Sequence, residues 1–491
     1  MKDQLLALGR RLSPEQWMIY GLGLVITLSI WCSIRYYMEV LLGVPMLLLI
    51  MYWCIIDFKK VFFILLACIP ISIEYYFPNG LATDLPTEPL IVGLMLVSAA
   101  YFLQHFKTMK VDFFKHPLTL LLLLHLAWTL ITTVTSHQFG FSIKFFIAKI
   151  WYVVTFYFLA AKLLRTEDDL KMLIRYIAIP LTFIVIVCII RHSFLGFTFE
   201  DVNFALSPFF RNHVTYAAVM ALFFPFIWLA LSWYPRWSRS WWAVLFCIVI
   251  LLIGINFSYT RAAYGAILLS LGAYYAMRLR AMKYVLGIFL IIATLGITAL
   301  VNNNKYLDFA PDYSKTIMHK SFDNLLEATY KLQDISTMER VYRWIAGFRM
   351  VSEKPFMGFG PGNFYSFYKD YTVNSFKTYV SHNPEQSGVH SYYLMVTVEQ
   401  GYIGLFIFLM LNIAVMLYAE NIYHATPIES GRRRMVLMAS MCFIIIQALL
   451  MMNDLIETDK TGPFYYICIA ILVNMDITNR RTNHEIQIFS L

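Results

Sequence analysis

The chain has 491 residues, of which 59% are apolar and only 14% are charged. Soluble globular proteins average about 25% charged residues, so a deficit this large excludes a soluble protein and indicates one surrounded by lipid. The formal net charge of +9 could suggest nucleic-acid binding, but the basic residues separate apolar runs and do not form a patch. We therefore expect the lipid bilayer as a partner and no nucleic acid.

The apolar runs predict transmembrane helices, because a bilayer core needs roughly 20 apolar residues per helix and tolerates no unpaired backbone groups. The expected fold is an all-α polytopic membrane protein with about 14 (12–14) transmembrane helices, of which the last is the shortest. The predicted spans are 17–34, 38–56, 61–77, 90–106, 117–135, 145–164, 172–190, 214–232, 241–258, 262–279, 284–301, 391–418, 436–453 and 463–477.

The orientation follows from the positions of Lys and Arg, which favour cytoplasmic loops. They concentrate in one alternating set of short loops and in both terminal segments. This pattern places both termini in the cytoplasm and the long segment 302–390 outside. The chain is then divided into spans 1–11 (1–301), an outer cap (302–390), and spans 12–14 with a cytoplasmic tail (391–491).

The outer cap is rich in charged residues and cannot be explained by spanning. Ser336–Glu339 has the pattern of a capping box and predicts a helix that runs to about Glu353. On that helix Arg340, Arg343 and Gly347 fall within about 60° of one another. An alternative is a solvated ion pair between Glu339 and Arg343, which are four residues apart.

A glycine-rich stretch follows, with Gly358, Gly360 and Gly362 within five residues. Glycines allow tight turns with exposed N–H groups, so Gly360 and Gly362 are candidates for contact with phosphate. The spacing matches neither the Walker nor the dinucleotide fingerprint, which makes this a weak signal.

His390 precedes the twelfth predicted span. If one helix ran from His390, then Gly401 and Gly404 would lie about +20° and −40° from its direction, and the three would form one stripe. Small residues allow a neighbouring element to approach closely and could hold His390 against it. The alternative is a glycine packing seam with an incidental interfacial histidine. Glu399 would lie about 180° away, so it should pair with another helix or face a cavity.

Two arginines depart from the charge pattern at the predicted outer edge. Arg211 precedes the eighth span and Arg261 lies between the ninth and tenth, where snorkelling to lipid headgroups is the ordinary explanation. With His213 and His390 nearby on the same side, they also fit an anionic group held at the outer leaflet. Asp454, after the thirteenth span, is a further candidate.

Taken together, these stretches resemble the bacterial O-antigen ligase and polymerase family over roughly residues 205–410. The matching features are Ser258–Ala263 with Arg261, Arg340 with Trp344, Lys354–Pro355 with the glycine-rich stretch that follows, and His390–Ser391 with Gly401 and Gly404. The sequence departs from the common ligase pattern in its span count, which is closer to that of polymerases, and in having Ser391 where Asn is common.

The resemblance implies transfer of a glycan from undecaprenyl diphosphate to an acceptor hydroxyl, on the periplasmic side of the bacterial inner membrane, without a cofactor, metal or nucleotide sugar. Arg211, Arg261 and either Arg340 or Arg343 would stabilise the diphosphate, because negative charge develops on it as it leaves. His390 would be the general base, with an imidazole pKa near its usual value of about 6.5.

Several functions remain open at this stage. A ligase would use lipid A-core as the acceptor, whereas a polymerase would use a second carrier-linked repeat. Protein O-glycosylating transferases share the histidine pattern. A lipid-linked oligosaccharide flippase is a different class, but transporters place their sites near the bilayer midplane, often on broken helices. A purely structural membrane protein would leave the basic outer edge unexplained.

Overall fold

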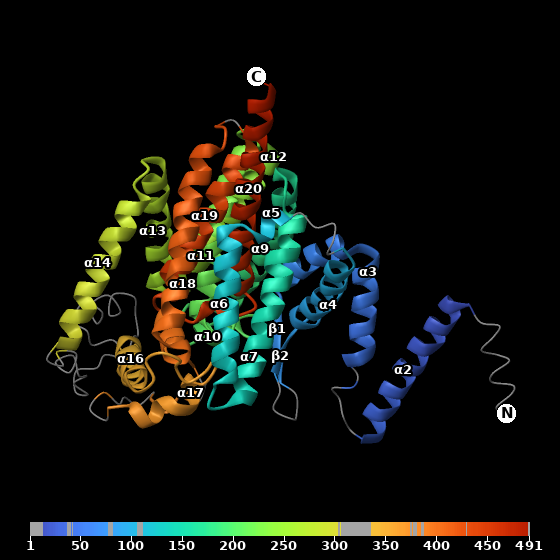
Figure 1. Ribbon diagram of the computed structural model, residues 1–491, viewed down its shortest axis with the longest axis horizontal. Helices are drawn as coiled ribbons and strands as arrows, with labels where there is room; N and C mark the ends of the chain where they lie inside the picture. Colours follow the sequence, from blue (N-terminus) through green and yellow to red (C-terminus); the bar gives the residue numbers. More distant parts are fainter. Residues whose placement is uncertain are drawn as a thin grey trace.

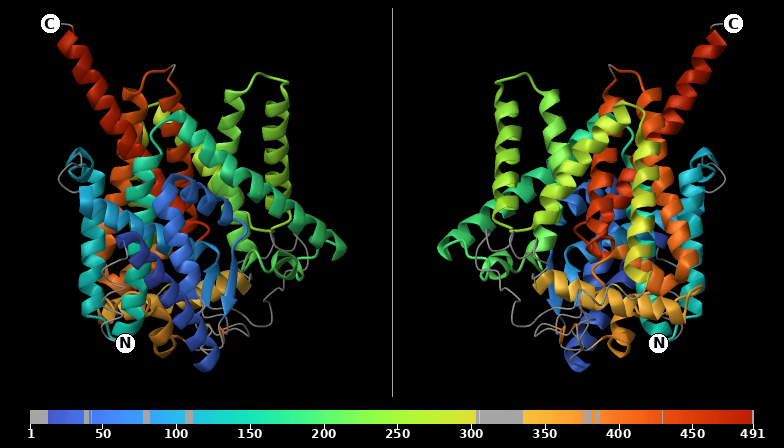
Figure 2. Two further views of the ribbon diagram at one scale, coloured as in Figure 1. Left: turned by 90° about the vertical axis from the view of Figure 1, so that its right-hand side faces the viewer. Right: turned by 90° about the vertical axis from the view of Figure 1, so that its left-hand side faces the viewer.

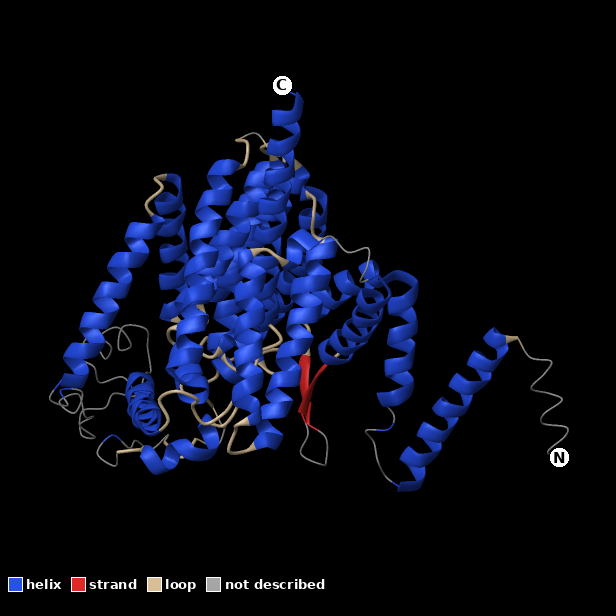
Figure 3. Cartoon of the chain, in the orientation of Figure 1, coloured by secondary structure: helices blue, strands red, loops and turns tan. Residues whose placement is uncertain are grey.

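The computed structural model describes residues 13–36, 41, 43–76, 82–105, 111–302, 305, 335–373, 376, 381–383, 387–428 and 430–489. Within these residues the chain is a bundle of long helices with one small β-hairpin (Figures 1 and 3). The helices of the first half are α2 (Pro14–Tyr36), α3 (Gly43–Cys68), α4 (Thr87–His105), α5 (Val111–Phe114), α6 (Pro117–Val134), α7 (Phe139–Tyr152), the π-helical η3 (Val153–Leu159), α8 (Ala160–Leu163), α9 (Glu167–Phe194), α10 (Val202–Leu206) and α11 (His213–Ala230).

The second half continues the bundle and adds the short elements that surround the site. Its helices are η4 (Leu231–Trp233), α12 (Arg239–Asn256), α13 (Arg261–Arg278), α14 (Met282–Val301), α16 (Ile335–Glu353), α17 (Phe364–Phe367), η6 (Tyr368–Tyr371), α18 (Tyr392–Ala425), α19 (Gly431–Leu450), η8 (Leu455–Glu457) and α20 (Gly462–Phe489). In Figures 1 and 2, α16 and α17 lie across one end of the bundle, and α20 extends to the opposite end.

Nine helices in the described part of the chain are long and apolar enough to cross a membrane. They are 87–105, 117–134, 139–163, 167–194, 213–233, 239–256, 282–299, 392–425 and 431–450. The expected class of a helical membrane protein is therefore confirmed. The number of spans, the outer cap and the orientation stay predictions, because residues 1–12, 306–334 and 490–491 are among those outside the described residues.

Two predicted spans near the N-terminus differ from the structure. The segments 38–56 and 61–77 correspond to the two halves of α3, which is kinked at Asp57 (φ −151°, ψ 78°) and ends at Cys68. Residues 73–76 are then a strand, β1 (Ile73–Tyr76), paired antiparallel with β2 (Ala82–Leu85). The third predicted span was too long because its apolar and aromatic residues continue past the helix into this hairpin.

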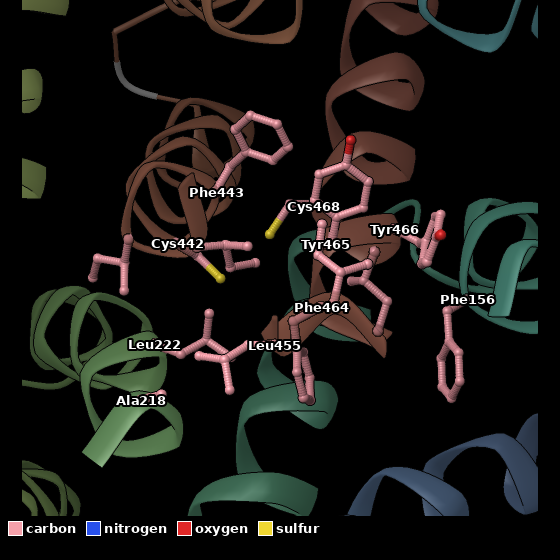
Figure 4. Packing of buried hydrophobic residues seen from close by; sticks show 14 of the residues in the cluster. Phe156, Ala218, Leu222, Cys442, Phe443, Leu455, Phe464, Tyr465, Tyr466 and Cys468 are labelled. Atoms are coloured by element: carbon pink, nitrogen blue, oxygen red, sulfur yellow. The ribbon is translucent and has the colours of Figure 1, made fainter. Parts of the chain in front are cut away.

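The core gathers around α19 and the first half of α20, whose apolar side chains are almost all buried (Figure 4). Phe464 meets Phe223 of α11 edge to face with ring centroids 4.5 Å apart, and Tyr465 stacks on Phe443 of α19 at 5.4 Å. The segment that joins α19 to α20, which we call the 451–461 loop, inserts Leu455 into this core. Hydrogen bonds from His390 N to Asp454 and from Tyr392 OH to Glu457 then join this loop to the start of α18.

Candidate functional site

His390 lies just before α18 and has a left-handed backbone conformation, with φ of +57°. Non-glycine residues rarely adopt this conformation, and it concentrates at functional sites. The carboxylate of Asp454 in the 451–461 loop stabilises it, because Asp454 Oδ2 accepts a hydrogen bond from His390 N at 3.2 Å. The helix begins only after Ser391, whose hydroxyl accepts from Leu394 N as an N-cap.

The expected helical stripe from His390 through Gly401 to Gly404 is therefore wrong. His390 precedes the helix, and α18 is broken at Gly401, where φ is +69° and ψ is −176°. The glycines do permit close approach, but to two different elements. A Cβ at Gly404 would lie 3.2 Å from Trp128 Nε1 of α6, whereas a Cβ at Gly401 would collide with the backbone of Phe356.

Arg343 of α16 contacts the imidazole directly. Its Nη1 donates to His390 Nε2 at 2.9 Å, to Gly388 O at 2.9 Å and to Ser387 Oγ at 2.8 Å. Its Nε and Nη2 donate to Glu339 Oε1 at 3.1 and 3.0 Å. The ion pair between Glu339 and Arg343 is thus confirmed, but it is buried and not solvated, since the two residues are only 7% and 3% exposed.

This contact defines the state of His390. Because a guanidinium can only donate, Nε2 is an acceptor and the imidazole is neutral, with its proton on Nδ1. Burial, followed by the charges of Arg343 and Arg340, lowers the pKa of His390 to about 3. The expectation of a pKa near 6.5 is therefore wrong for this state of the protein, because it ignored burial and two neighbouring cations.

The two carboxylate oxygens of Asp454 differ in their hydrogen bonding. Oδ2 accepts a hydrogen bond from the backbone N–H of His390, whereas the buried Oδ1 has no hydrogen-bond partner among the described residues. Burial raises the pKa of Asp454 to about 6, and the hydrogen bond from His390 and the charge of Arg343 oppose that rise. A buried acceptor beside the imidazole can take a hydrogen bond from a bound hydroxyl.

The remaining candidates are linked to His213 by charge, by a shared contact or by nearness along the chain. Arg340 is near enough for its charge to act on both His390 and His213, so it links the two histidines. The carbonyl of His213 accepts a hydrogen bond from Thr260 Oγ1 at 3.3 Å, and Arg261 follows Thr260 as the first residue of α13. Arg211 stands two residues before His213, and its charge acts on Tyr76 of β1.

The turn before α13 is tightly built and sets the position of Arg261. Thr260 N donates to Ser258 Oγ at 3.3 Å, and Ser258 Oγ donates to Ile255 O at 2.6 Å. Tyr259 between them has a left-handed conformation, with φ of +54°. Two of the sequence elements singled out above, at 258–261 and at 390, therefore carry the same rare backbone geometry at the same end of the bundle.

The glycine-rich loop serves packing in this structure. Phe359 N donates to Val398 O at 3.0 Å, Gly360 N donates to Glu399 O at 2.9 Å, and the Glu399 carboxylate accepts from the N–H groups of Gly362 and Phe364. The N–H groups that were expected to meet a phosphate thus bond to protein acceptors. Glu399, as expected, does not orient His390.

One polar group near the site was not anticipated. Lys149 of α7 is buried and forms an ion pair with Glu457 Oε1 of the 451–461 loop at 3.3 Å, and Tyr392 OH donates to the same oxygen at 2.5 Å. A lysine inside the predicted span 145–164 was the available signal. In the described part of the chain, no three His, Cys, Asp or Glu side chains group closely enough to hold a metal ion.

Comparison with known proteins gives a match over the part of the chain that contains most of these residues. Residues 246–409 match the model of a family described as O-Antigen ligase. This match covers roughly a third of the chain, begins in α12 and ends within α18, and includes Arg261, Arg340, Arg343 and His390. Arg211, His213 and Asp454 lie outside it. A search of curated proteins found no match to this chain.

Proposed function

We propose that this protein transfers a glycan from undecaprenyl diphosphate to a hydroxyl of lipid A-core. The match of residues 246–409 to the family described as O-Antigen ligase supports this proposal. The transfer takes place at the periplasmic face of the bacterial inner membrane. The observation that carries the proposal is the buried contact between Arg343 and His390, which lies inside the matched segment and beside Asp454. A structural scaffold gains nothing from a strained histidine held between a guanidinium and a carboxylate.

The arginines stabilise the diphosphate as it leaves. When the acceptor oxygen attacks the anomeric carbon, the bond from that carbon to the diphosphate breaks and negative charge develops on the diphosphate. Fixed guanidinium groups in a site shielded from water stabilise that charge without reorganisation. Arg211, Arg261 and Arg340 take this role, since the charge of Arg340 acts on both His213 and His390, Arg261 follows Thr260, which binds the His213 carbonyl, and Arg211 precedes His213 by two residues.

His390 is the general base, and its Nε2 lone pair receives the hydroxyl proton. In the free protein that lone pair already accepts a hydrogen bond from Arg343. A bound diphosphate competes for Arg343 and offsets the charges of Arg343 and Arg340, which together lower the pKa of His390. Donor binding therefore frees the Nε2 lone pair of His390 from Arg343 and raises the pKa of the imidazole. The acceptor hydroxyl is then activated only after the donor has bound.

Asp454 supports this base from behind. Its Oδ2 binds the His390 backbone N–H, and its buried Oδ1, which has no partner among the described residues, would accept a hydrogen bond from the incoming hydroxyl. Back-side attack by that hydroxyl inverts the anomeric configuration. A product that retains the configuration of the donor would exclude this single displacement.

The direct test is reconstitution of the purified protein with carrier-linked glycan, with and without lipid A-core, followed by sizing of the product. A lipid-A-linked species that forms only when lipid A-core is present supports the ligase. A ladder of longer carrier-linked chains without lipid A-core would show a polymerase instead, which shares the donor and the chemistry but not the acceptor. The His390→Ala variant serves as the inactive control.

A further inference from the structure

The β-hairpin is the element near the site that has no role so far. Its strands pair Glu74 with Asp84 and Tyr76 with Ala82. Residues directly opposite one another share a face of the hairpin, and alternate residues along a strand do as well. Glu74, Tyr76 and Asp84 therefore form one face, which we call the Glu74–Tyr76 face, and Tyr75 stands on the other.

The open end of the hairpin, where β1 begins and β2 ends, is joined to the 451–461 loop. Lys460 Nζ donates to Ser72 O at 3.0 Å and to Ser72 Oγ at 2.6 Å, immediately before β1. Asp459 Oδ2 accepts from Ser72 Oγ at 2.5 Å and from Thr87 Oγ1 at 3.2 Å, just after β2. Asp459 and Lys460 are each only 6% exposed, so these contacts are buried from solvent.

This attachment places the hairpin close to the reacting groups. Asp454, which binds the His390 backbone, is five residues from Asp459, and five extended residues span at most about 17 Å. On the other side, Lys460, which binds Ser72 just before β1, has its Nζ 5.3 Å from the centroid of the ring of Phe210, the residue next to Arg211. The hydrogen bond from the Tyr76 hydroxyl to Glu74 raises the pKa of that phenol, and the charge of Arg211 opposes the rise. The hairpin thus stands beside an arginine assigned to the diphosphate.

The chemistry of this face suits sugars and not phosphates. Tyr76 is 61% exposed and offers a flat apolar ring with a polar tip, on which the apolar face of a sugar ring can stack. The neighbouring carboxyl groups of Glu74 and Asp84 form hydrogen bonds with hydroxyl groups, and an acidic face does not attract a diphosphate. A neutral, hydroxyl-rich chain that leaves the diphosphate at Arg211 would meet this surface first.

We propose that the Glu74–Tyr76 face binds the sugars of the donor glycan that adjoin the diphosphate. The proposal rests on the proposed function for its donor, and it adds a glycan subsite outside the segment that matches the family. Tyr76 would be a binding residue and not a catalytic one. The competing explanation is that both tyrosines anchor the chain at the membrane surface, where aromatic residues are common.

The test compares two adjacent tyrosines on opposite faces. The full-length protein in nanodiscs is titrated with undecaprenyl diphosphate that carries the glycan and with glycan-free undecaprenyl diphosphate. Tyr76→Ala should weaken binding of the glycan-bearing carrier about twofold to tenfold, as expected for the loss of one stacked ring, and leave the glycan-free carrier unchanged. Tyr76→Phe, which keeps the ring, should retain binding.

Tyr75→Ala is the matched control, since Tyr75 is 44% exposed on the other face, and it should bind both carriers as the unmodified protein does. Equal losses for Tyr75→Ala and Tyr76→Ala, or equal loss for both carriers, would overturn the proposal. If Tyr76→Ala does not fold, Glu74→Gln tests the same face, and an unselective or absent effect would overturn it too. Because binding needs no turnover, selective binding without transfer to lipid A-core would refute only the proposed function.

Discussion

A single methyl group added at Gly401 should destabilise the folded protein, because the helix α18 is broken there and the segment that leads into the glycine-rich loop packs against the break. Its φ of +69° and ψ of −176° belong to a region that only glycine occupies readily. A Cβ would lie 2.8 Å from Met357 N and closer still to the carbonyl of Phe356. It would also press on the hydrogen bond from Tyr402 N to Pro355 O, which is 2.7 Å long.

The expected cost of Gly401→Ala follows from these terms. The backbone conformation costs an alanine about 1–3 kcal/mol, and overpacking against backbone atoms that cannot move aside adds about 1–3 kcal/mol. We therefore expect a loss of about 2–6 kcal/mol and a clear drop in melting temperature in detergent or nanodiscs. Glycan transfer should fall as well, because the first turns of α18 carry the His390 region.

Gly265→Ala is the control for this measurement. Gly265 lies within α13, and a Cβ there would meet no atom within 4 Å. Alanine is favoured over glycine inside a helix by about 0.5–1 kcal/mol, so this variant should melt at the same temperature as the unmodified protein or slightly above it. If Gly401→Ala and Gly265→Ala melted alike, the break in α18 would not be a rigid feature and the reasoning would be refuted.

Three further predictions concern the groups around the imidazole. His390→Ala and Arg261→Ala should each abolish glycan transfer while membrane insertion stays intact, and normal product from either variant would remove that residue from the mechanism. Lys149→Met should lower the free energy of unfolding by about 1–3 kcal/mol, because the half-buried Glu457 carboxylate then loses its cation and keeps only the hydrogen bond from Tyr392 OH, and a melting curve of the double variant with Glu457→Gln should show most of the loss restored. The pKa of Asp454 is about 6 in the folded protein against an ordinary value of 3.8, so this group adds stability as pH falls from 6 to 3.8. The pKa of His390 is about 3 in the folded protein against an ordinary value of 6.5, so this group removes stability as pH falls below 6.5. Asp454→Asn should therefore steepen the decrease in melting temperature between pH 6 and pH 4, and an unchanged slope would contradict these pKa directions.

Several features could be predicted from the sequence because they depend on neighbours along the chain. The predicted span 117–135 corresponds to α6, Pro117–Val134, since helix length in a membrane follows directly from the length of an apolar run. The helix predicted from Ser336 to Glu353 is α16, Ile335–Glu353, because its residues favour a helix locally. The pairing of Glu339 with Arg343 likewise needed only their four-residue spacing.

The grouping of His390 with basic residues was anticipated from residue type, but its details were not. Helical spacing assumes an unbroken helix, so it misplaced His390, which lies outside α18, and Gly401, which breaks it. The hairpin at 73–85 was assigned in part to a span because hydropathy does not distinguish an apolar strand from the end of a helix.

The amino-acid sequence by itself determined that this chain is a helical membrane protein with charged and glycine-rich elements gathered around residues 336–404. Only the tertiary structure decided which of those elements touch. Arg343 reaches His390 across 47 residues and Asp454 reaches it across 64, and burial then sets the protonation state of the imidazole. The physical reason is that helix formation in lipid depends on local composition, whereas side-chain contacts, desolvation and pKa depend on how distant segments pack.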